Sequence, residues 1–480
     1  MRYAAIGNAT NDRAAEAVNM EGVIDGWMRL YRGEMPWLEE THHHTLRLPT
    51  IIASEIARMV TLEAEINVNG DGERARFLDE QFEPVRKKLR KYTEYACAGG
   101  GLMFKPYIKD NDLTVDIVQA DLFYPIAYDS SGNIISAGFL ERKNIGKDTY
   151  TRIEKHIHTK DGYTIKNECY KSTNGSEVGV PAPLSDVPEW KDIQAELKIE
   201  GENVPPLFAY FGIPKGNTKD QRSPLGVSVY ADAIGNIRDA DFLYDWFMWE
   251  FEGGQLHVEV SADAFAKDKR GQAIIPDGRE RLYLVNKFTA DTAGNTDLMK
   301  EFSPELRDEA FERAMNEVKQ IVEYNSGLAY GTISKLQETE KTATEIRAGK
   351  QRSYSTVTDI QRALQDALEH LIAAMNALCD IYGLGGDGMP ENPPAGENGA
   401  RTPTAARQPY ELAFVWDDSI VVDAEVERAR DLEEVAQGIM NKWEYRKKWY
   451  GEDEAQAKAA IAEAEPKSND DIMGFGGGVT

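Results

Sequence analysis

One long helical stretch, residues 342–382, constrains the fold more than any other part of the sequence. Thr342 and Glu345 have the spacing of a capping box, in which both side chains accept free backbone N–H groups of the first helical turn. Apolar residues then recur every three or four positions, at Val357, Ile360, Leu364, Leu368, Leu371, Met375, Leu378 and Tyr382. Such a helix is about 60 Å long, which exceeds the core of one compact domain. The stretch therefore predicts an extended or ring-like architecture.

The N-terminal part of the chain changes from a helical period to a period of two near Gly99. Helices are predicted over residues 20–32, 46–64 and 73–98, with a loop at 67–72. Short alternating runs follow, divided by turn signals such as Asp161-Gly162, and they indicate an antiparallel meander over residues 102–108, 113–118, 123–128, 134–142, 149–158 and 163–171. A linker that contains Pro and Gly, residues 174–206, closes this part.

Two helices bracket a small insertion in the middle of the chain. Ser-Pro pairs at Ser223 and at Ser303 predict where these helices begin, because a serine can cap a helix and proline fits its first position. The predicted helices span residues 223–252 and 303–324, and the insertion between them contains strand-like runs at 256–260 and 282–286. The first helix is apolar on two sides, which requires two neighbours. Further segments are predicted as a strand at 410–416, helices at 423–437, 440–450 and 452–465, and a disordered tail at 466–480.

Charge and composition narrow the functional classes. The 480 residues include 81 acidic and 55 basic side chains, a formal charge of −26. This balance argues against a protein that grips nucleic acid through a basic surface, but it allows one that lets nucleic acid pass. The sequence shows no long apolar run and no signal-peptide pattern, so we expect synthesis in the cytoplasm without a membrane span. Three distant cysteines fit no metal or disulfide framework and are predicted to be reduced.

Catalytic motifs are weak in this sequence. The run Gly383 to Gly388 matches GxGxxG, but it follows a helix and not a strand, so it does not predict a dinucleotide site. His156 and His158 would share one face of a strand, yet the sequence marks no third ligand for a metal. We therefore predict no catalytic residue, no metal and no cofactor. A metal-dependent hydrolase and an unrelated helical scaffold stay open as alternatives.

The order of these segments resembles the portal proteins of tailed bacteriophages, in the branch of long-tailed phages of Gram-positive hosts. The resemblance spans about residues 27–465, and Lys341-Thr-Ala-Thr-Glu-Ile346 is its most specific motif. Other matching motifs are Ser223-Pro-Leu-Gly226, Asp239-Ala-Asp241, Ser326-Gly-Leu-Ala-Tyr-Gly331, Trp416-Asp-Asp-Ser419, Asp423-Ala-Glu425 and Gly438-Ile-Met-Asn-Lys442.

The resemblance implies an α+β portal fold, with the parts laid out along the chain. They would be an α/β wing (1–222), a first stem helix (223–252), a small β-containing clip (253–302), a second stem helix (303–324), a tunnel loop (325–341), a long wing helix (342–382), a loop with a returning wing strand (383–422), an α-helical crown (423–465) and a disordered tail (466–480).

The resemblance also implies a function that involves no bond chemistry. Portal proteins form rings of about twelve subunits at one capsid vertex, and double-stranded DNA passes through them during packaging and ejection. Their partners are terminase, scaffolding and major capsid proteins, and a head-completion adaptor; the mature location is the virion. The implied DNA-facing loop residues are Ser334, Lys335, Gln337, Glu338, Glu340 and Lys341. The two-sided helix suggests a subunit interface at Phe242, Trp246 and Trp249, and the clip suggests partner contacts at Lys267, Lys269 and Arg270.

Overall fold

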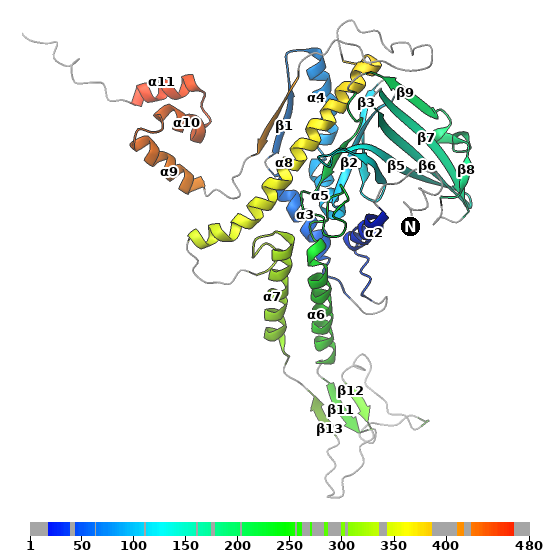
Figure 1. Cartoon of the computed structure of the whole chain (residues 1–480). Helices are drawn as coiled ribbons and strands as arrows, with labels where there is room; N and C mark the ends of the chain where they lie inside the picture. The colour runs from blue at the N-terminus through cyan, green and yellow to red at the C-terminus, as the bar shows by residue number, and fades with distance from the viewer. Residues whose placement is uncertain are drawn as a thin grey trace, which may run out of the picture. The chain divides into compact units, whose positions relative to one another are not determined.

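The computed structural model in Figure 1 divides into two compact units, Met1–Val415 and Trp416–Thr480. The residues that it describes are 18–38, 44–62, 64–109, 112–159, 162–173, 178–201, 204–254, 257–261, 269–270, 283–286, 299–302, 306–335, 343–385, 410–416 and 424–464. The fold is mixed α and β, as the sequence predicted. The capping residue Thr342 and the predicted tail at 466–480 lie outside the described residues.

The first unit begins with helices α2 (Val18–Arg32), α3 (Leu48–Thr61), α4 (Glu73–Arg86) and α5 (Leu89–Gly99). The prediction of one helix over 73–98 was wrong, because the chain turns at Lys87 and Lys88. The turn lets α4 pack on strand β1 and helix α8, whereas α5 packs mainly on α3. Strand β1 (Ala64–Asn69) also occupies part of the segment that was predicted as a loop.

Two antiparallel sheets follow the helices. Strands β2 (Gly101–Lys109), β3 (Asp112–Gln119) and β10 (Ala209–Gly212) form one sheet, in the order β10-β2-β3. The other sheet has six strands, β4 (Phe123–Tyr128), β5 (Ile134–Ile145), β6 (Asp148–Thr159), β7 (Gly162–Ser172), β8 (Val180–Ala182) and β9 (Glu196–Glu200). Strands β4 to β7 confirm the last four runs of the predicted meander, whereas the first two runs, β2 and β3, belong to the separate sheet.

The segment predicted as a linker, residues 174–206, is largely part of the second sheet. It contributes β8, β9 and two short 3-10 turns, Leu184–Asp186 and Pro188–Trp190. Trp190 is buried against Tyr150 and Cys169 in a small core on this sheet. The linker prediction was therefore wrong, because apolar residues between the prolines and glycines supply enough burial to order the segment.

A buried charge cluster joins the two sheets. The ammonium of Lys105 on β2 lies 2.9 Å from the carboxylate of Glu154 on β6. His156 uses one ring nitrogen for Glu154, at 2.8 Å, and the other for the hydroxyl of Tyr163, at 2.9 Å. His158 is bonded to the carbonyl oxygen of Val204. Both histidines considered as metal ligands therefore have protein partners.

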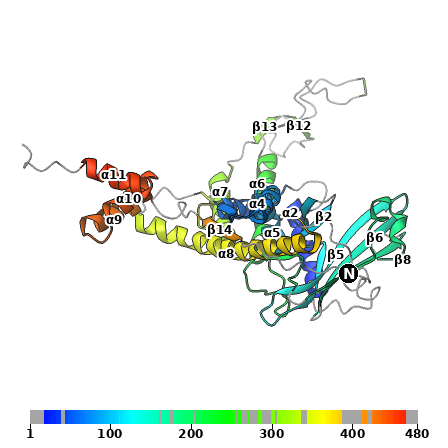
Figure 2. The ribbon, with the colours of Figure 1, turned by 90° about the horizontal axis from the view of Figure 1, so that it is seen from above.

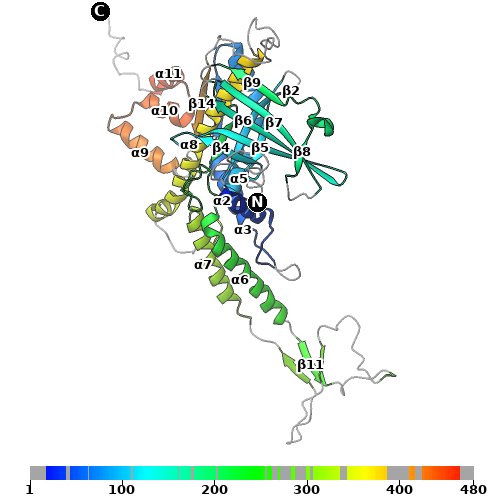
Figure 3. The same cartoon turned by 45° about the vertical axis from the view of Figure 1, so that its right-hand side comes forward.

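Helices α6 (Ile234–Gly253) and α7 (Asp308–Ser326) lie side by side and antiparallel (Figures 1 and 3). Neither begins at its predicted Ser-Pro signal. Residues 223–230 are irregular and bond to the end of α5, where the amide of Val229 donates to the carbonyl of Cys97 at 3.0 Å. A Cβ on Gly226 would lie 2.2 Å from the carbonyl oxygen of Gly100, so only glycine fits there. Helix α7 begins after Arg307, and Ser303 lies outside the described residues.

A three-stranded sheet connects the end of α6 to the start of α7. It consists of β11 (His257–Ser261), β12 (Tyr283–Asn286) and β13 (Met299–Phe302), with β11 in the centre, parallel to β12 and antiparallel to β13. The strands β11 and β12 match the predicted runs, and β13 was missed because its sequence, Met-Lys-Glu-Phe, is short and half charged.

Helix α8 (Ala343–Tyr382) confirms the predicted long helix and runs along the first unit (Figure 2). It packs on β2, β10, α3 and α4, and its apolar stripe is buried from Ile360 to Leu378. Near its end Asp380 lies 2.7 Å from the buried guanidinium of Arg74 on α4. The same guanidinium donates to the side-chain oxygen of Asn376 at 2.8 Å and to the carbonyl of Gly385 at 3.1 Å.

The remaining elements are one strand and the second unit. Strand β14 (Glu411–Trp416) pairs with β1, as a returning strand does. The second unit contains α9 (Ala424–Ala436), α10 (Lys442–Tyr450) and α11 (Glu454–Ala464), each within two residues of its prediction. Asn441 and Glu444 form a capping box at the start of α10, and Asp431 accepts a bond from the indole of Trp449 at 2.8 Å.

The three cysteines, Cys97, Cys169 and Cys379, are free and buried, which confirms the prediction that they are reduced structural residues. Among the residues that the structure describes, no helix is long and apolar enough to cross a membrane.

Candidate functional site

The end of α7 carries the beginning of the predicted tunnel loop. Gly327 adopts a left-handed conformation, with φ of 77°, and the amide of Leu328 donates to the carbonyl of Glu323 at 2.9 Å. This is a glycine stop signal that ends the helix and satisfies its last carbonyls. A Cβ on Gly327 would stand 2.6 Å from the hydroxyl of Thr356, so no larger residue fits here without movement.

The carboxylate of Glu323, which is fully buried, holds the first part of this loop. It accepts hydrogen bonds from the backbone amides of Gly331 at 3.1 Å, Ile333, and Ser334 at 2.8 Å. The hydroxyl of Ser334 donates a fourth bond at 2.8 Å. A buried carboxylate is stable only when such donors surround it. Glu323 therefore folds residues 331–334 back over α7.

Helix α8 supports the same segment from the other side. The hydroxyl of Ser353 accepts from the amide of Ala329 at 2.6 Å, and the hydroxyl of Thr356 donates to the carbonyl of Gly327 at 2.9 Å. Arg352 donates to the carbonyl of Tyr324 at 2.8 Å, and its guanidinium stacks 3.8 Å from the centre of the Tyr324 ring. The segment from Gly327 to Ser334, which we call the loop root, is thus fixed by α7 and α8 together.

Two predicted DNA-facing residues are described, and both have protein partners. Ser334 is buried, and both its amide and its hydroxyl are bonded to Glu323. Lys335 is exposed, but its amide donates to Asn316 at 2.7 Å and its ammonium pairs with Glu312 on α7. Gln337, Glu338, Glu340 and Lys341 lie outside the described residues. Glu323, which organises the root, was not singled out in the sequence, where it is one acidic helical residue among many.

The proposed interface residues lie along α6. The indoles of Trp246 and Trp249 are 61% and 67% exposed in the single chain, and Phe242 is half-buried. The opposite contacts of α6 are made to α7, where the ring of Phe247 lies 5.7 Å from that of Phe311 and Glu250 pairs with Arg307 at 2.9 Å. Two large exposed indoles on one helix are an unusual surface for a monomer.

The α6 and α7 pair is acidic. Helix α6 has five acidic residues and one basic residue, and α7 has five acidic residues and two basic residues. Asp241, in α6, is buried and accepts bonds from the amide of Leu46 at 2.8 Å and the indole of Trp37 at 3.1 Å. Burial raises its pKa even though these bonds act in the opposite direction. Glu323 is buried as well, and Glu250 and Glu312 pair with Arg307 and Lys335. The remaining carboxylates leave the surface of the pair acidic.

The residues suggested for partner contacts lie in the connection between β11 and β12. Lys269 and Arg270 are exposed in a turn, and Lys267 lies outside the described residues.

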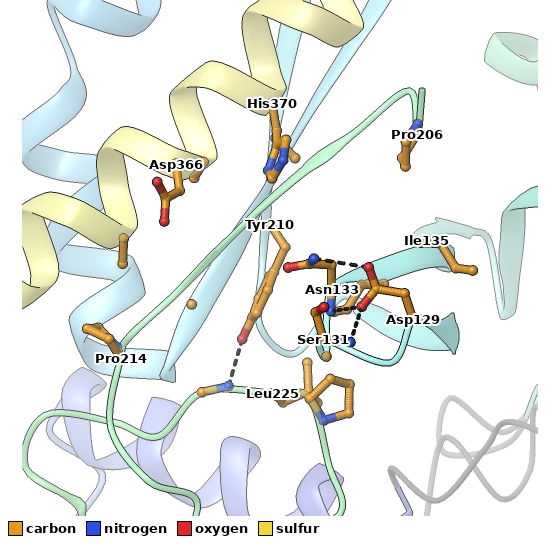
Figure 4. Close-up of a pocket in the computed structure, with 18 of the residues that line it drawn as sticks. Asp129, Ser131, Asn133, Ile135, Pro206, Tyr210, Pro214, Leu225, Asp366 and His370 are labelled. Atoms are coloured by element: carbon orange, nitrogen blue, oxygen red, sulfur yellow. Dashed lines mark hydrogen bonds between the residues drawn. The ribbon is translucent and has the colours of Figure 1, made fainter. Parts of the chain in front are cut away.

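A cavity of about 700 Å³ opens beside α8 (Figure 4), and no sequence motif pointed to it. Asp366 and His370 line it from α8, and the turn between β4 and β5 lines it with Asp129. The carboxylate of Asp129 accepts from the amide of Asn133 at 2.9 Å and from that of Ser131 at 2.8 Å, and the bonds from Asn133 are the main reason why its pKa is lowered. The carboxylate of Asp129 therefore stabilises the turn between β4 and β5.

Tyr210 occupies the centre of this cavity in Figure 4, with its hydroxyl oxygen accepting from the amide of Gly226 at 2.8 Å. Burial raises the pKa of Tyr210 to about 12, so the phenol stays protonated and cannot act as a base near neutral pH. Among the described residues, no group of three or more His, Cys, Asp and Glu side chains is placed to hold a metal ion.

Comparisons with known proteins give only structural likenesses. No protein-family model matches the chain, and no curated protein sequence matches it. One similar solved chain belongs to the virion of a native gene transfer agent particle, with a TM-score of 0.45 and 9% identity over 89% of this chain and 93% of that chain. Another belongs to the neck of a native gene transfer agent particle computed with C12 symmetry, with a TM-score of 0.43 and 10% identity over 88% of this chain and 92% of that chain.

Proposed function

We propose that this chain is the portal protein of a tailed-phage-like particle, a ring of about twelve copies through which double-stranded DNA passes. The observation that carries the proposal is the arrangement of α6, the small sheet, α7, the loop root and α8. An acidic helix pair leads into the loop root, which Glu323 fixes, and the 40-residue helix α8 is bonded to the same root. We assign these elements to the stem, clip, tunnel loop and wing helix that the resemblance to portal proteins implies.

The proposed role needs no catalytic residue. Carboxylates along α6 and α7 would keep phosphates from adhering, while the loops beyond residue 335 would reach the DNA. In the cavity beside α8, two of the polar side chains, Asp129 and Tyr210, accept hydrogen bonds from backbone amides and so serve the fold. We therefore propose a conduit and assembly platform, not an enzyme. Its proposed partners are terminase, scaffolding and major capsid proteins and a head-completion adaptor, at one vertex of the virion.

Native mass spectrometry of the purified protein, with negative-stain images of the same sample, tests the ring. We expect a closed ring with a central hole and a mass near twelve times 53.7 kDa. Monomers that stay monomeric across the accessible protein concentrations and in the presence of a scaffolding protein would reject the proposal.

A deletion of residues 336–341 tests the conduit separately from the ring. It leaves Glu323, Ser334 and the Lys335–Glu312 pair in place. We expect rings of normal mass that give particles with little packaged DNA, measured as the DNA content of purified particles. Normal DNA content would contradict the loop role, and loss of the ring would show that the segment acts in assembly.

A further inference from the structure

The α6 and α7 pair has two different sides, which can be located from its internal contacts. Phe247 faces Phe311, Glu250 meets Arg307, and near the other end the amide of Asn325 donates to Asn236 at 2.9 Å. These contacts run along one line in opposite chain directions, so the helices are antiparallel over their whole length. Since each helical residue turns by about 100°, the neighbours of a contact residue point to the two sides of the pair.

One side presents exposed apolar side chains, although the exposed Asp239 and Glu317 also point to it at about 100° per residue. Trp246 is the residue before Phe247, and Ala310 is the residue before Phe311. In two antiparallel helices, the residues that precede the two contact residues point to the same side of the pair. Ile321 follows Phe311 by ten residues, so about 100° per residue brings it back to nearly the same direction as Ala310. Trp246 is 61% exposed and Ile321 is 47% exposed, and Ala310 is also exposed. We call this the apolar side.

The opposite side carries the loop root. Met248 follows Phe247 and Glu312 follows Phe311, so both residues point away from the apolar side. Glu312 pairs with the ammonium of Lys335, and Asn316, one turn further along α7, accepts from the Lys335 amide at 2.7 Å. We call this the loop side. Met248 and Glu312 flank the same Phe247–Phe311 contact as Trp246, and so they lie at the same height along the pair.

We propose that the apolar side of one copy packs against the loop side of the next, with Trp246 covering Met248 and the Glu312–Lys335 ion pair of its neighbour. The inference rests on the proposed ring. Rotation about an axis parallel to the helices keeps every residue at its own height, so residues level in one copy are level across the interface. The contact is between unlike surfaces, and it closes when the rotation completes a ring.

The chemistry of the two sides is complementary. An indole packs favourably on a thioether and attracts an ammonium over its face. Exposed ion pairs contribute little to stability because water screens them. Covering the Glu312–Lys335 pair would reduce this screening. Since Lys335 is bonded to α7 through both its amide and its ammonium, each loop would then be fastened to two copies, its own and the neighbouring one.

Cysteine cross-linking tests the inference. In the variant Lys319→Cys with Ile321→Cys, the two thiols stand two residues apart on α7, on the loop side and the apolar side respectively. They turn about 200° away from each other and cannot join within one copy. We expect oxidation of assembled rings to produce a ladder of covalent multimers on denaturing, non-reducing gels. The native cysteines are buried and stay silent.

The matched control is Ala310→Cys with Ile321→Cys, which places both thiols on the apolar side. It should give no ladder. A ladder from the control, or none from the test variant in rings of normal mass, would overturn the inference while leaving the ring intact. Failure of the unmodified chain to form rings would instead reject the proposed function.

Discussion

Two buried carboxylates, Glu323 and Glu154, show how much structure depends on single side chains. Glu323 ties the loop root to α7 with four hydrogen bonds, and Glu154 ties β6 to Lys105 on the other sheet. Each would be costly to bury alone, so each requires its partners to be in place. Their effects can be separated, because one acts on a loop and the other on the contact between two sheets.

Glu323→Gln should loosen the loop root. The amide nitrogen of glutamine cannot accept a bond, so two of the four donors would face another donor. Hydrogen bonds to charged groups contribute about 1.5–3 kcal/mol each, and the local opening energy should fall by at least that amount. Hydrogen exchange of residues 328–335 should become about tenfold faster or more. Glu317→Gln, an exposed substitution in the same helix, should leave exchange in the root unchanged.

Acidification should destabilise the sheets through His156. Burial lowers the pKa of His156 more than its bond to Glu154 raises it. A histidine in an unfolded chain has a pKa of about 6.5. Below that pH the unfolded chain binds a proton at His156, whereas the native chain does not. The melting temperature should therefore fall as the pH drops from about 6.5 toward the folded pKa.

Further loss should follow below about pH 4.3, the ordinary value for glutamate. Burial raises the pKa of Glu154, but Lys105, His156 and Arg152 outweigh this effect and lower it. The variant His156→Asn should flatten the first part of the melting curve against pH. Replacing the exposed His370 by Asn should not change it, and equal slopes in both variants would contradict the assignment to His156.

At the scale of elements, the spacing of apolar residues predicted the helices and strands better than local start and stop signals such as Ser-Pro, proline and glycine did. Helix α8, the meander and the three short helices of the second unit follow from regular spacing of apolar residues. The Ser-Pro signals at 223 and 303 predicted helix starts that tertiary packing moved to Ile234 and Asp308. Similarly, prolines and glycines in 174–206 concealed the segment that buries Trp190. The hydrogen bonds of the loop root could not be predicted from the sequence, because no local sequence pattern relates the residues that they join.

Removal of one partner of the ion pair between Arg74 and Asp380 should destabilise the contact between α8 and α4. Arg74→Met leaves the Asp380 carboxylate buried without its charge partner, which typically costs about 3–5 kcal/mol of unfolding free energy. The double variant Arg74→Met with Asp380→Leu should recover most of the loss, as measured by chemical denaturation. Equal instability of the single and double variants would show that packing, not the stranded charge, sets the cost.

At the scale of the whole molecule, several large exposed apolar side chains of the first unit lie on α6 and α7. Trp246, Trp249, Phe251, Ile321 and Tyr324 are all at least 41% exposed. Side chains of this kind dominate the energy of protein interfaces. The proposed ring would cover part of this surface.

Trp246→Ala should weaken assembly. Loss of an interface tryptophan often costs about 2 kcal/mol or more, and about 1.4 kcal/mol corresponds to a tenfold change. The protein concentration at which half of the chains are in rings should rise at least tenfold, as measured by mass photometry. Val180→Ala, at a residue 66% exposed on β8, serves as the control and should assemble normally.

Helix α8 has a mechanical consequence. It is bonded to the loop root at Ser353 and Thr356 and to α4 at Asp380, two anchorages about 36 Å apart at 1.5 Å per residue. A tilt of about one degree at one anchorage would displace the other by about 0.6 Å, roughly the tolerance of a hydrogen bond. We therefore expect the loop root and α4 to move together through α8.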